Sequence, residues 1–367
     1  MTRPRLAHLA WSKAHQGWSL SLADSSVCAP DLEALGLPHQ APVPRPGEDP
    51  LPALERALGA RLGAPGGRVL VTAGASEANA CVIAGLLDPG DEILVESPAY
   101  EPLRLVPSFF GVRARAFTRE RDHGYGRVRE AVEAALAPAT RLVLFTDLHN
   151  PGGVPLEDAD AEALTALAAR RGLWLACDET FRDASRRPTG TWSALSERWV
   201  TTSTLTKPYG LGALRIGWIS GSADALERCA NAQNALSVEP ARTSAGLALA
   251  LAPHLDALRE RAWRILEENR ALFARAVDSL PRVDPGPAPR GTTAFLRFPG
   301  AGEGDSFAAF AAERFGLLVV PGRFFGDPDG VRIGLGEEPS RFAAAIEVLR
   351  EAARAFAGSG ATAGGSA

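Results

Sequence analysis

Cysteine is scarce in this sequence, and its placement argues against a metal site. Four cysteines occur in 367 residues, at positions 28, 81, 177 and 229. They form no C-x-x-C pair and have no nearby histidine partners, so we expect no zinc site and no other bound metal. Cys81 and Cys177 lie in apolar runs and are predicted to be small buried side chains, which suits a reducing cytosol.

Long apolar runs and an excess of one charge are also missing. No run approaches the roughly 20 apolar residues that span a bilayer, and the apolar stretch in MTRPRLAHLAW is too short for a signal peptide. The net charge is −4 and the basic residues are scattered, which points to neither a nucleic-acid nor an anionic-membrane partner. We therefore expect a cytoplasmic protein.

The remaining composition fits a soluble protein of about two domains, with 46% hydrophobic and 22% charged residues. From about residue 45 to 235, short apolar runs alternate with helical patterns at 76–87 and 157–171. The runs are apolar without alternation, as strands of a parallel sheet covered on both faces are; they lie at 68–72, 92–96, 141–146, 173–177, 200–204 and 215–220. This pattern predicts an α/β domain.

The rest of the chain has a different pattern. A long helical stretch at 241–279 leads to strands at 293–298, 316–320 and 331–335 and to helices at 305–315 and 340–357, which predicts a smaller α+β domain. We therefore divide the chain into an N-terminal arm at 1–44 that packs on the small domain, a large domain at 45–235, an interdomain helix and small domain at 236–357, and a disordered tail at 358–367.

Lys207 is the first candidate for chemistry, because it follows a strand in TSTLTKPYGLGALRIGW (202–218). A lysine becomes nucleophilic when burial or nearby charge lowers its pKa from about 10.4, although most lysines after a strand are simply solvated. Here Thr204, Thr206 and Arg215 bracket it with two hydroxyls and a guanidinium, a set that suits a phosphate group.

Gly74-Ala75-Ser76 joins a strand to a helix and forms a second candidate anion site. The free N–H groups and the dipole at the helix start favour a phosphate. The alternative is an ordinary helix cap with Ser76 as the N-cap residue.

Three further residues are ambiguous when taken alone. Asp178 is either a turn residue or a partner for a cationic ring nitrogen at the carboxyl end of the sheet. Asn150 is either a turn residue before Pro151 or an amide donor to a ligand oxygen. Tyr100 is either a core residue or a stacking ring.

Together these residues resemble one family, the fold-type I pyridoxal-phosphate (PLP) enzymes of the class I and II, aspartate-aminotransferase-like group. The resemblance spans about residues 45–357. Its motifs, in order, are TAGASEA (72–78), SPAY (97–100), HNPGG (149–153), DETF (178–181), TLTKPYGLGALRIG (204–217), PGRFFG (321–326) and VRIGL (331–335).

The resemblance implies a PLP-dependent aminotransferase that moves an amino group between an amino acid and a 2-oxo acid, in a homodimer with the site at the interface. Catalysis would rest on Lys207, as the Schiff-base lysine and proton shuttle, with Asp178 and Tyr100. The implied roles are pairing with the ring nitrogen for Asp178, stacking on the ring for Tyr100, contact with the phenolic oxygen and the substrate for Asn150, phosphate binding for Ala75, Ser76, Thr204, Thr206 and Arg215, and substrate carboxylate binding for Arg332.

Two departures from the family pattern stand out. Phe181 occupies a cofactor-binding position where the family commonly has a tyrosine that touches the phenolic oxygen. The family also has a tyrosine shortly before the glycine that corresponds to Gly47, reaching the partner subunit's phosphate; His39 or Arg45 is the candidate replacement here. Both weaken the case for ordinary transamination more than the case for PLP binding.

Other functions stay open at this point. A PLP-dependent lyase, decarboxylase or cyclase is the main alternative, because substrate contacts decide the fate of the carbanion after Cα deprotonation. A nicotinamide dehydrogenase is disfavoured, since the full G-x-G-x-x-G is absent. A regulatory cofactor-binding domain is disfavoured too, because Lys207 and Asp178 are both present.

Overall fold

A seven-stranded sheet forms the largest layer of the computed structural model, which describes residues 4–360. Within this sheet β8 runs antiparallel to both of its neighbours, and the strands from β7 to β4 are parallel. The order is β2 (Leu70–Thr72), β8 (Gly217–Ser220), β7 (Trp199–Thr204), β6 (Trp174–Asp178), β5 (Thr140–Thr146), β3 (Glu92–Ser97) and β4 (Arg113–Thr118). The predicted α/β class with a mostly parallel sheet is confirmed.

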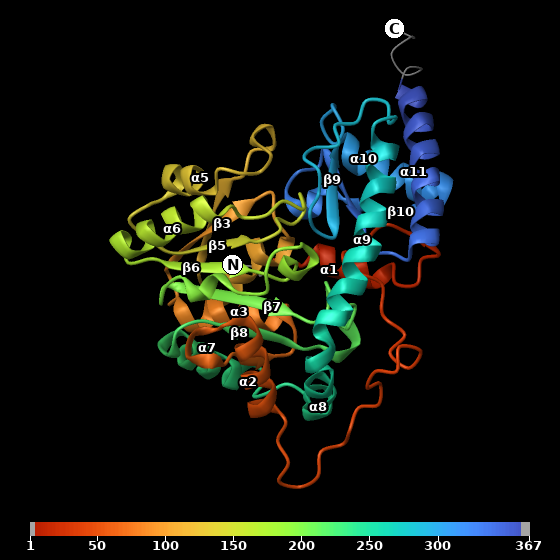
Figure 1. The fold of residues 1–367 in the computed structure, drawn as a ribbon. Helices are drawn as coiled ribbons and strands as arrows, with labels where there is room; N and C mark the ends of the chain where they lie inside the picture. The colour runs from red at the N-terminus through yellow and green to blue at the C-terminus, as the bar shows by residue number, and fades with distance from the viewer. Residues whose placement is uncertain (1–3, 361–367) are drawn as a thin grey trace.

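Helices cover both faces of this sheet (Figure 1), which explains the unbroken apolar runs. On β5, Leu142 and Leu144 face a core shared with α3 (Ala75–Leu86) and α7 (Ala223–Leu236). Val143 and Phe145 of the same strand face a second core, shared with the helices α5 (Val128–Ala135) and α6 (Asp158–Arg171). Further helices, α2 (Leu51–Leu62) and α4 (Glu101–Leu105), lie beside the sheet.

A smaller layer follows in the last third of the chain. It contains the antiparallel sheet β11 (Val320–Pro321), β12 (Gly330–Gly334) and β9 (Thr293–Arg297), with α9 (Leu255–Val277), α10 (Glu303–Phe315) and α11 (Pro339–Gly360) packed around it. The helical stretch predicted at 241–279 is two helices, α8 (Arg242–Leu251) and α9. A 3₁₀ turn, η7 (Ala252–His254), separates them, because Pro253 has no N–H for the helical ladder.

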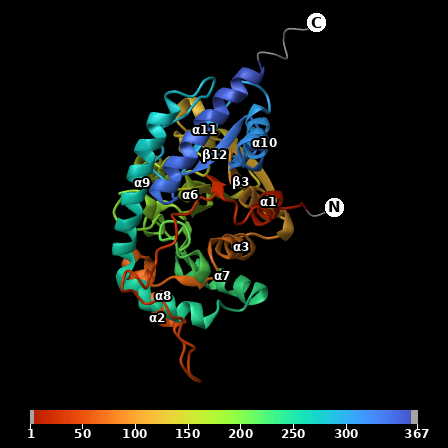
Figure 2. The ribbon, with the colours of Figure 1, turned by 90° about the vertical axis from the view of Figure 1, so that its right-hand side faces the viewer.

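The N-terminal segment crosses this smaller layer. Helix α1 (Ala7–Ala14) comes first, and β1 (Leu20–Ser21) pairs in parallel with β10 (Leu317–Leu318). Figure 2 shows α1 on the side of the molecule where α3 and α10 also lie. We call residues 20–28, which run from β1 toward Lys207, the strap.

Two glycines let the strap lie directly on the end of β12. A Cβ at Gly334 would lie 1.7 Å from the carbonyl oxygen of Asp24, and one at Gly336 would lie 2.1 Å from that of Ser26. No other residue type fits this close backbone approach, so the sequence at 334–336 fixes where the strap runs.

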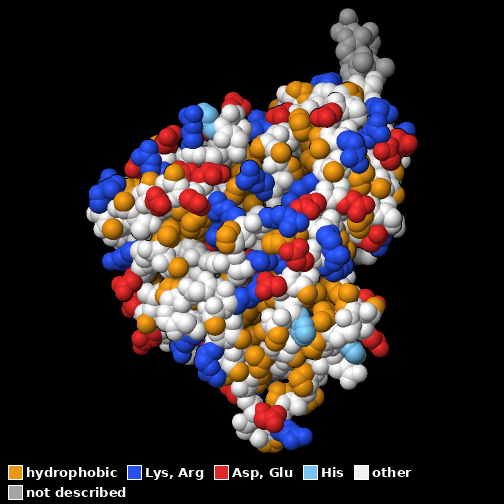
Figure 3. All heavy atoms as spheres, in the orientation of Figure 1, with side chains coloured by type: hydrophobic (Ala, Val, Ile, Leu, Met, Phe, Trp, Pro, Cys, Tyr) orange, Lys and Arg blue, Asp and Glu red, His pale blue; other side chains and the backbone are white. Residues whose placement is uncertain are grey.

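The remaining short elements are 3₁₀ helices: η1 (Pro65–Gly67), η2 (Val106–Phe110), η3 (Arg121–His123), η4 (Arg182–Ala184), η5 (Trp192–Ala194), η6 (Gly212–Leu214) and η8 (Gly322–Phe325). The domain boundaries given above stay a prediction, and most of the predicted disordered tail, 361–367, lies outside the described residues. No helix in the described part is long and apolar enough to cross a membrane. Figure 3 shows acidic and basic side chains interspersed on one face.

Candidate active site

All of the predicted site residues line a single cleft of about 970 Å³. The cleft lies at the carboxyl edge of the large sheet, and α1, the strap and β12 also contribute to it. The predicted residues that line it are Ala75, Ser76, Tyr100, Asn150, Asp178, Phe181, Thr204, Thr206, Lys207, Arg215 and Arg332.

Strand register explains why residues distant in sequence meet at this edge. Thr146 of β5 is paired with Asp178 of β6, and Asp178 is paired with Thr202 of β7. The carboxyl ends of three parallel strands therefore lie side by side, which is where open α/β sheets bind ligands.

Asp178 is buried and held in place by two donors. Its side chain accepts hydrogen bonds from Asn79 Nδ2 at 2.8 Å and from the backbone N–H of Thr180 at 2.9 Å. Asn79 in turn accepts one from Thr202 Oγ1 at 2.8 Å. Burial raises the pKa of Asp178 above its ordinary value, against these hydrogen bonds and the charge of Lys207. A cationic ligand nitrogen beside it would offset that burial cost.

Asn79 is a residue that our sequence reasoning missed. It lies on α3 three residues after Ser76, and both line the cleft. Residues three apart lie on the same face of a helix. Because Ser76 was already a candidate, Asn79 could have been predicted from its position three residues later.

The start of α3 and the side chain of Arg215 line one end of the cleft. Gly74 precedes the helix with φ +91°, and a Cβ there would lie 2.6 Å from Arg215 Nη2. Ser76 lies inside the first turn and Gly74 is the N-cap, so the alternative of Ser76 as N-cap is wrong. The first-turn N–H groups, which a helix leaves without partners, thus lie beside a guanidinium.

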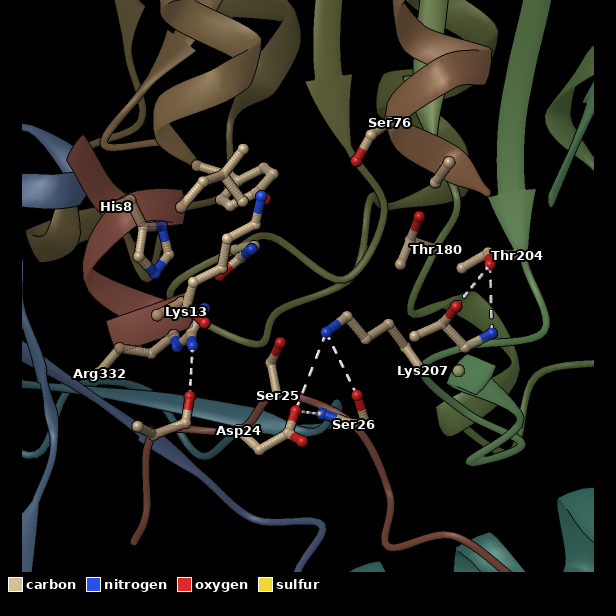
Figure 4. Close-up of a pocket in the computed structure, with 18 of the residues that line it drawn as sticks. His8, Lys13, Asp24, Ser25, Ser26, Ser76, Thr180, Thr204, Lys207 and Arg332 are labelled. Atoms are coloured by element: carbon tan, nitrogen blue, oxygen red, sulfur yellow. Dashed lines mark hydrogen bonds and ion pairs between the residues drawn. The ribbon is translucent and has the colours of Figure 1, made fainter. Parts of the chain in front are cut away.

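Thr204 and Thr206 both line the cleft, and their side chains are hydrogen-bonded to each other. Thr204 Oγ1 donates to the carbonyl of Ile216 at 2.7 Å and lies 3.0 Å from Thr206 Oγ1 (Figure 4). Together with Ser76 and Arg215 they surround one end of the cleft with donors that suit a phosphate dianion.

Asn150, Tyr100 and Phe181 line the space between these groups. Asn150 Oδ1 is buried and has no hydrogen-bond partner among the described residues. Burial raises the pKa of Tyr100 to about 12. Phe181 is buried. Phe181 itself offers no hydroxyl to a ligand in the cleft, and of the three tyrosines of the chain Tyr100 is the only one that lines it.

Lys207 projects into the middle of the cleft, where the strap meets it (Figure 4). Its Nζ donates to Ser26 Oγ at 3.2 Å and lies 3.9 Å from Asp24 Oδ1. Burial lowers the pKa of Lys207, and the charges of Arg332 and Arg215 lower it further while Asp24 opposes them. A lowered pKa makes this amine a better nucleophile near neutral pH. Asp24 and Ser26 were not predicted from the sequence.

Arg332 lies across the cleft from the threonines. It is buried, its Nη2 donates to the carbonyl of Ala23 at 2.7 Å, and its Nε has no partner. Burial lowers the pKa of Arg332 to about 10. A buried guanidinium with an unpaired donor suits a ligand carboxylate.

His8 closes the same side from α1, and it too was missed. Its ring stacks on Phe324 at 5.0 Å and meets Tyr100 edge-on at 5.4 Å. Its backbone N–H donates to Glu101 Oε2 at 2.8 Å. Burial, with Arg332 and Lys207 nearby, lowers the pKa of His8 to about 3, so the ring is neutral at physiological pH.

The cleft fits pyridoxal phosphate by the chemistry of its donors. One end offers N–H groups, hydroxyls and a guanidinium for a phosphate; Asp178 offers a carboxylate for a cationic ring nitrogen; and Lys207 offers an amine for the aldehyde. Asn150 also lines the cleft, and its Oδ1 has no hydrogen-bond partner among the described residues. Among residues 4–360, no group of three or more His, Cys, Asp or Glu side chains is arranged to hold a metal ion.

Comparison with solved structures identifies the fold class. The chain superposes on a PLP-dependent aminotransferase from Streptococcus suis with a TM-score of 0.87 at 22% identity, covering 97% of this chain and 99% of that one. It also superposes on a PLP-dependent cyclase with a TM-score of 0.81 at 24% identity, covering 96% and 98%. The fold is that of the fold-type I PLP enzymes, as predicted.

Comparison with sequences gives the family. The model of the class I and II aminotransferases matches residues 47–349. Arginine–pyruvate transaminase of Pseudomonas aeruginosa is 30% identical over 302 residues, covering 79% of this chain and 74% of that protein. Capreomycidine synthase of Streptomyces vinaceus is 32% identical over 274 residues, covering 74% and 70%. The chain belongs to the class I and II aminotransferase family, and the predicted PLP-dependent aminotransferase is confirmed at this level.

Proposed function

We propose that the chain transfers an amino group between an amino acid and a 2-oxo acid, with PLP bound covalently through the amine of Lys207. The observation that carries this is the joint placement of Lys207, Asp178 and Arg332 in one cleft with a set of phosphate donors. When bound, PLP supplies an electron sink for the pair left by a broken Cα–H bond.

In this proposal each residue of the cleft has a separate role. Asp178 holds the ring nitrogen in its protonated form, and Asn79 fixes the orientation of that carboxylate. Arg332 binds the α-carboxylate, which fixes the Cα beside Lys207. Lys207 Nζ would be the base that takes the Cα proton and the acid that returns it. Tyr100 would pack against the cofactor ring, and Asn150 would donate to its phenolic oxygen.

Half-reactions test this proposal directly. Each amino acid is added to the cofactor-loaded protein, and loss of the visible absorbance is followed together with release of the matching 2-oxo acid. We expect one or a few amino acids to give stoichiometric oxo acid, and an added 2-oxo acid to restore the absorbance. If no amino acid releases a 2-oxo acid, transamination is excluded as the function.

A second candidate function is a PLP-dependent cyclase or lyase. Two observations favour keeping it: similar proteins include a capreomycidine synthase and a PLP-dependent cyclase by name, and Phe181 gives the cleft no hydroxyl at its position. In the half-reaction screen, this function would give a rearranged amino acid or ammonia, with the absorbance returning without an added oxo acid.

We also propose a homodimer in which residues 38–48 reach the partner's cleft. This segment has no helix or strand and projects away from the rest of the chain (Figures 1 and 2), and Val43 is 84% exposed. The four cysteines are free, which supports a cytoplasmic location as part of the same proposal.

Light scattering and one substitution test the dimer. We expect twice the monomer mass, and weaker cofactor binding in Arg45→Ala if this residue contacts the partner's phosphate. Arg56→Ala, an exposed arginine of α2 with no role in the proposal, is the control. A monomer with full cofactor affinity would overturn it.

A further inference from the structure

The strap contacts Lys207 at both ends of the residue. The backbone N–H of Val27 donates to the carbonyl of Lys207 at 2.8 Å. At the other end, Lys207 Nζ donates to Ser26 Oγ at 3.2 Å and lies 3.9 Å from Asp24 Oδ1. A segment that lies 181 residues earlier in the chain thus fixes both the backbone and the amine of the lysine.

The strap is itself firmly placed, so these contacts are not those of a loose loop. Its backbone is bonded to β10 and β12 through Leu22 and to Gly336 through Cys28. Asp24 Oδ1 also accepts the backbone N–H of Ser26 at 2.8 Å, which orients the carboxylate. The side chain of Asp24 lines the cleft and is 77% exposed.

We propose that Asp24 and Ser26 are positioning residues for the proton transfer by Lys207: they hold its amine whenever it is not attached to the cofactor. The inference rests on the proposed role of Lys207. In the transfer, the Cα–H bond breaks and its proton forms an N–H bond on Nζ, giving an ammonium. The ammonium is held by Ser26 Oγ and the carboxylate of Asp24. An N–H bond then breaks as the proton passes to C4′, and the neutral amine returns.

Charges from several elements face this amine. Asp24 and Asp178 favour its protonated form and raise the pKa of Lys207, while Arg332 and Arg215 lower it; the neutral ring of His8 on α1 lies on the same side of the cleft as Arg332 (Figure 4). If Asp24 loses its charge, the repulsion from Arg332 and Arg215 is less opposed, so the pKa of Lys207 falls.

The fall in the pKa of Lys207 can be measured, because the chain has only two lysines, Lys13 and Lys207. In the cofactor-free protein, acetylation of each lysine is followed by mass spectrometry from pH 6 to 11. We expect the titration midpoint of Lys207 to move down in Asp24→Asn, and to move further than that of Lys13, which lines the same cleft. Asp31→Asn is the matched control, because Asp31 is an exposed residue of the same arm outside the cleft.

Kinetics on the loaded enzyme give the second readout. Single-turnover rates with saturating amino acid should fall several-fold in Asp24→Asn and in Ser26→Ala, with KM little changed, and Asp24→Glu should recover most of the rate. An unchanged midpoint in Asp24→Asn, or an equal shift in Asp31→Asn, overturns the inference. Since the titration uses cofactor-free protein, that failure is distinct from a failure of Lys207 to carry the cofactor.

Discussion

The two sides of the cleft are built in different ways. On the cofactor side, Asp178 and Thr204 stand at the ends of neighbouring strands, and hydrogen bonds to Asn79 of α3 and to the carbonyl of Ile216 before β8 hold their side chains. On the substrate side, Arg332 bonds to a strap residue 309 positions away. The cofactor side is thus set by sheet register, whereas the substrate side depends on the chain ends coming together.

The difference predicts that substitutions of Lys207 affect the chemistry itself, and that substitutions of Arg332 affect binding. The largest effect is expected for Lys207→Ala. General acid–base groups typically contribute about 10²–10⁴-fold, and this variant also loses the covalent link, so kcat should fall at least about a thousandfold. Steady-state assays check this, with Arg56→Ala, at an exposed residue of α2 outside the cleft, as the control. A kcat close to that of the wild type would show that Lys207 is not the catalytic lysine.

Arg332→Lys should change binding instead. A planar guanidinium grips a carboxylate with two hydrogen bonds, which lysine does not reproduce. Loss of one charge-assisted hydrogen bond costs about 1.5–3 kcal/mol, so KM for amino acids should rise roughly 10- to 100-fold. The spectrum of the resting enzyme should stay the same. An unchanged KM would mean that Arg332 is structural or that the substrate is an amine without that carboxylate.

Phe181→Tyr tests whether residue 181 faces the phenolic oxygen of the cofactor. A tyrosine hydroxyl would donate to the phenolic oxygen and stabilise the deprotonated Lys207–cofactor linkage. At about 1.5–3 kcal/mol for such a bond and about 1.4 kcal/mol per pKa unit, the midpoint of a spectral pH titration should fall by roughly one to two units. Asn150 already serves the same oxygen in our proposal, which favours the lower end. A midpoint that does not fall would show that residue 181 does not face that oxygen.

The smallest effect is expected at His8, and it depends on pH. The pKa of His8 is lowered from 6.5 to about 3, so the docked ring is neutral while a released ring titrates normally. Docking of α1 is therefore complete above pH 6.5 and weakens below it, by about tenfold per pH unit down to pH 3.

Hydrogen exchange of the amides at 7–14, corrected for the intrinsic effect of pH, measures that docking. Between pH 6.5 and 5.5 the wild type should lose protection, whereas His8→Phe should keep it. His15→Phe, on the same arm, should behave like the wild type. Equal pH slopes in all three would contradict the role of His8.

The same contrast between the two sides explains how much the sequence revealed. The buried strands were predicted because helices cover both of their faces. Strand β4 was not, because it is an edge strand in which only Phe117 is buried. Helices α1, α2, α4, α5 and α7 were also missed, and the break between α8 and α9 at Pro253 was not foreseen.

For the site, most of the predicted residues belong to short motifs near strand ends or helix starts, where neighbours in sequence are neighbours in space, whereas Arg332 lies in the middle of β12. Asn79 was within reach of the same reasoning, since it shares a helix face with Ser76. Asp24, Ser26 and His8 were not, because their contacts form only when the arm folds back across β12. Nothing in the local sequence of the strap indicates Lys207 as its partner.

The assignment of the cofactor to Lys207 underlies all of these predictions, and peptide mapping checks it. The PLP-loaded protein is reduced with borohydride, digested and mapped by mass spectrometry. With only Lys13 and Lys207 in the chain, and both lining the cleft, the map has two internal lysines to choose between. We expect a pyridoxyl adduct on Lys207 alone. An adduct on Lys13, or none on either, would show that the assignment is wrong.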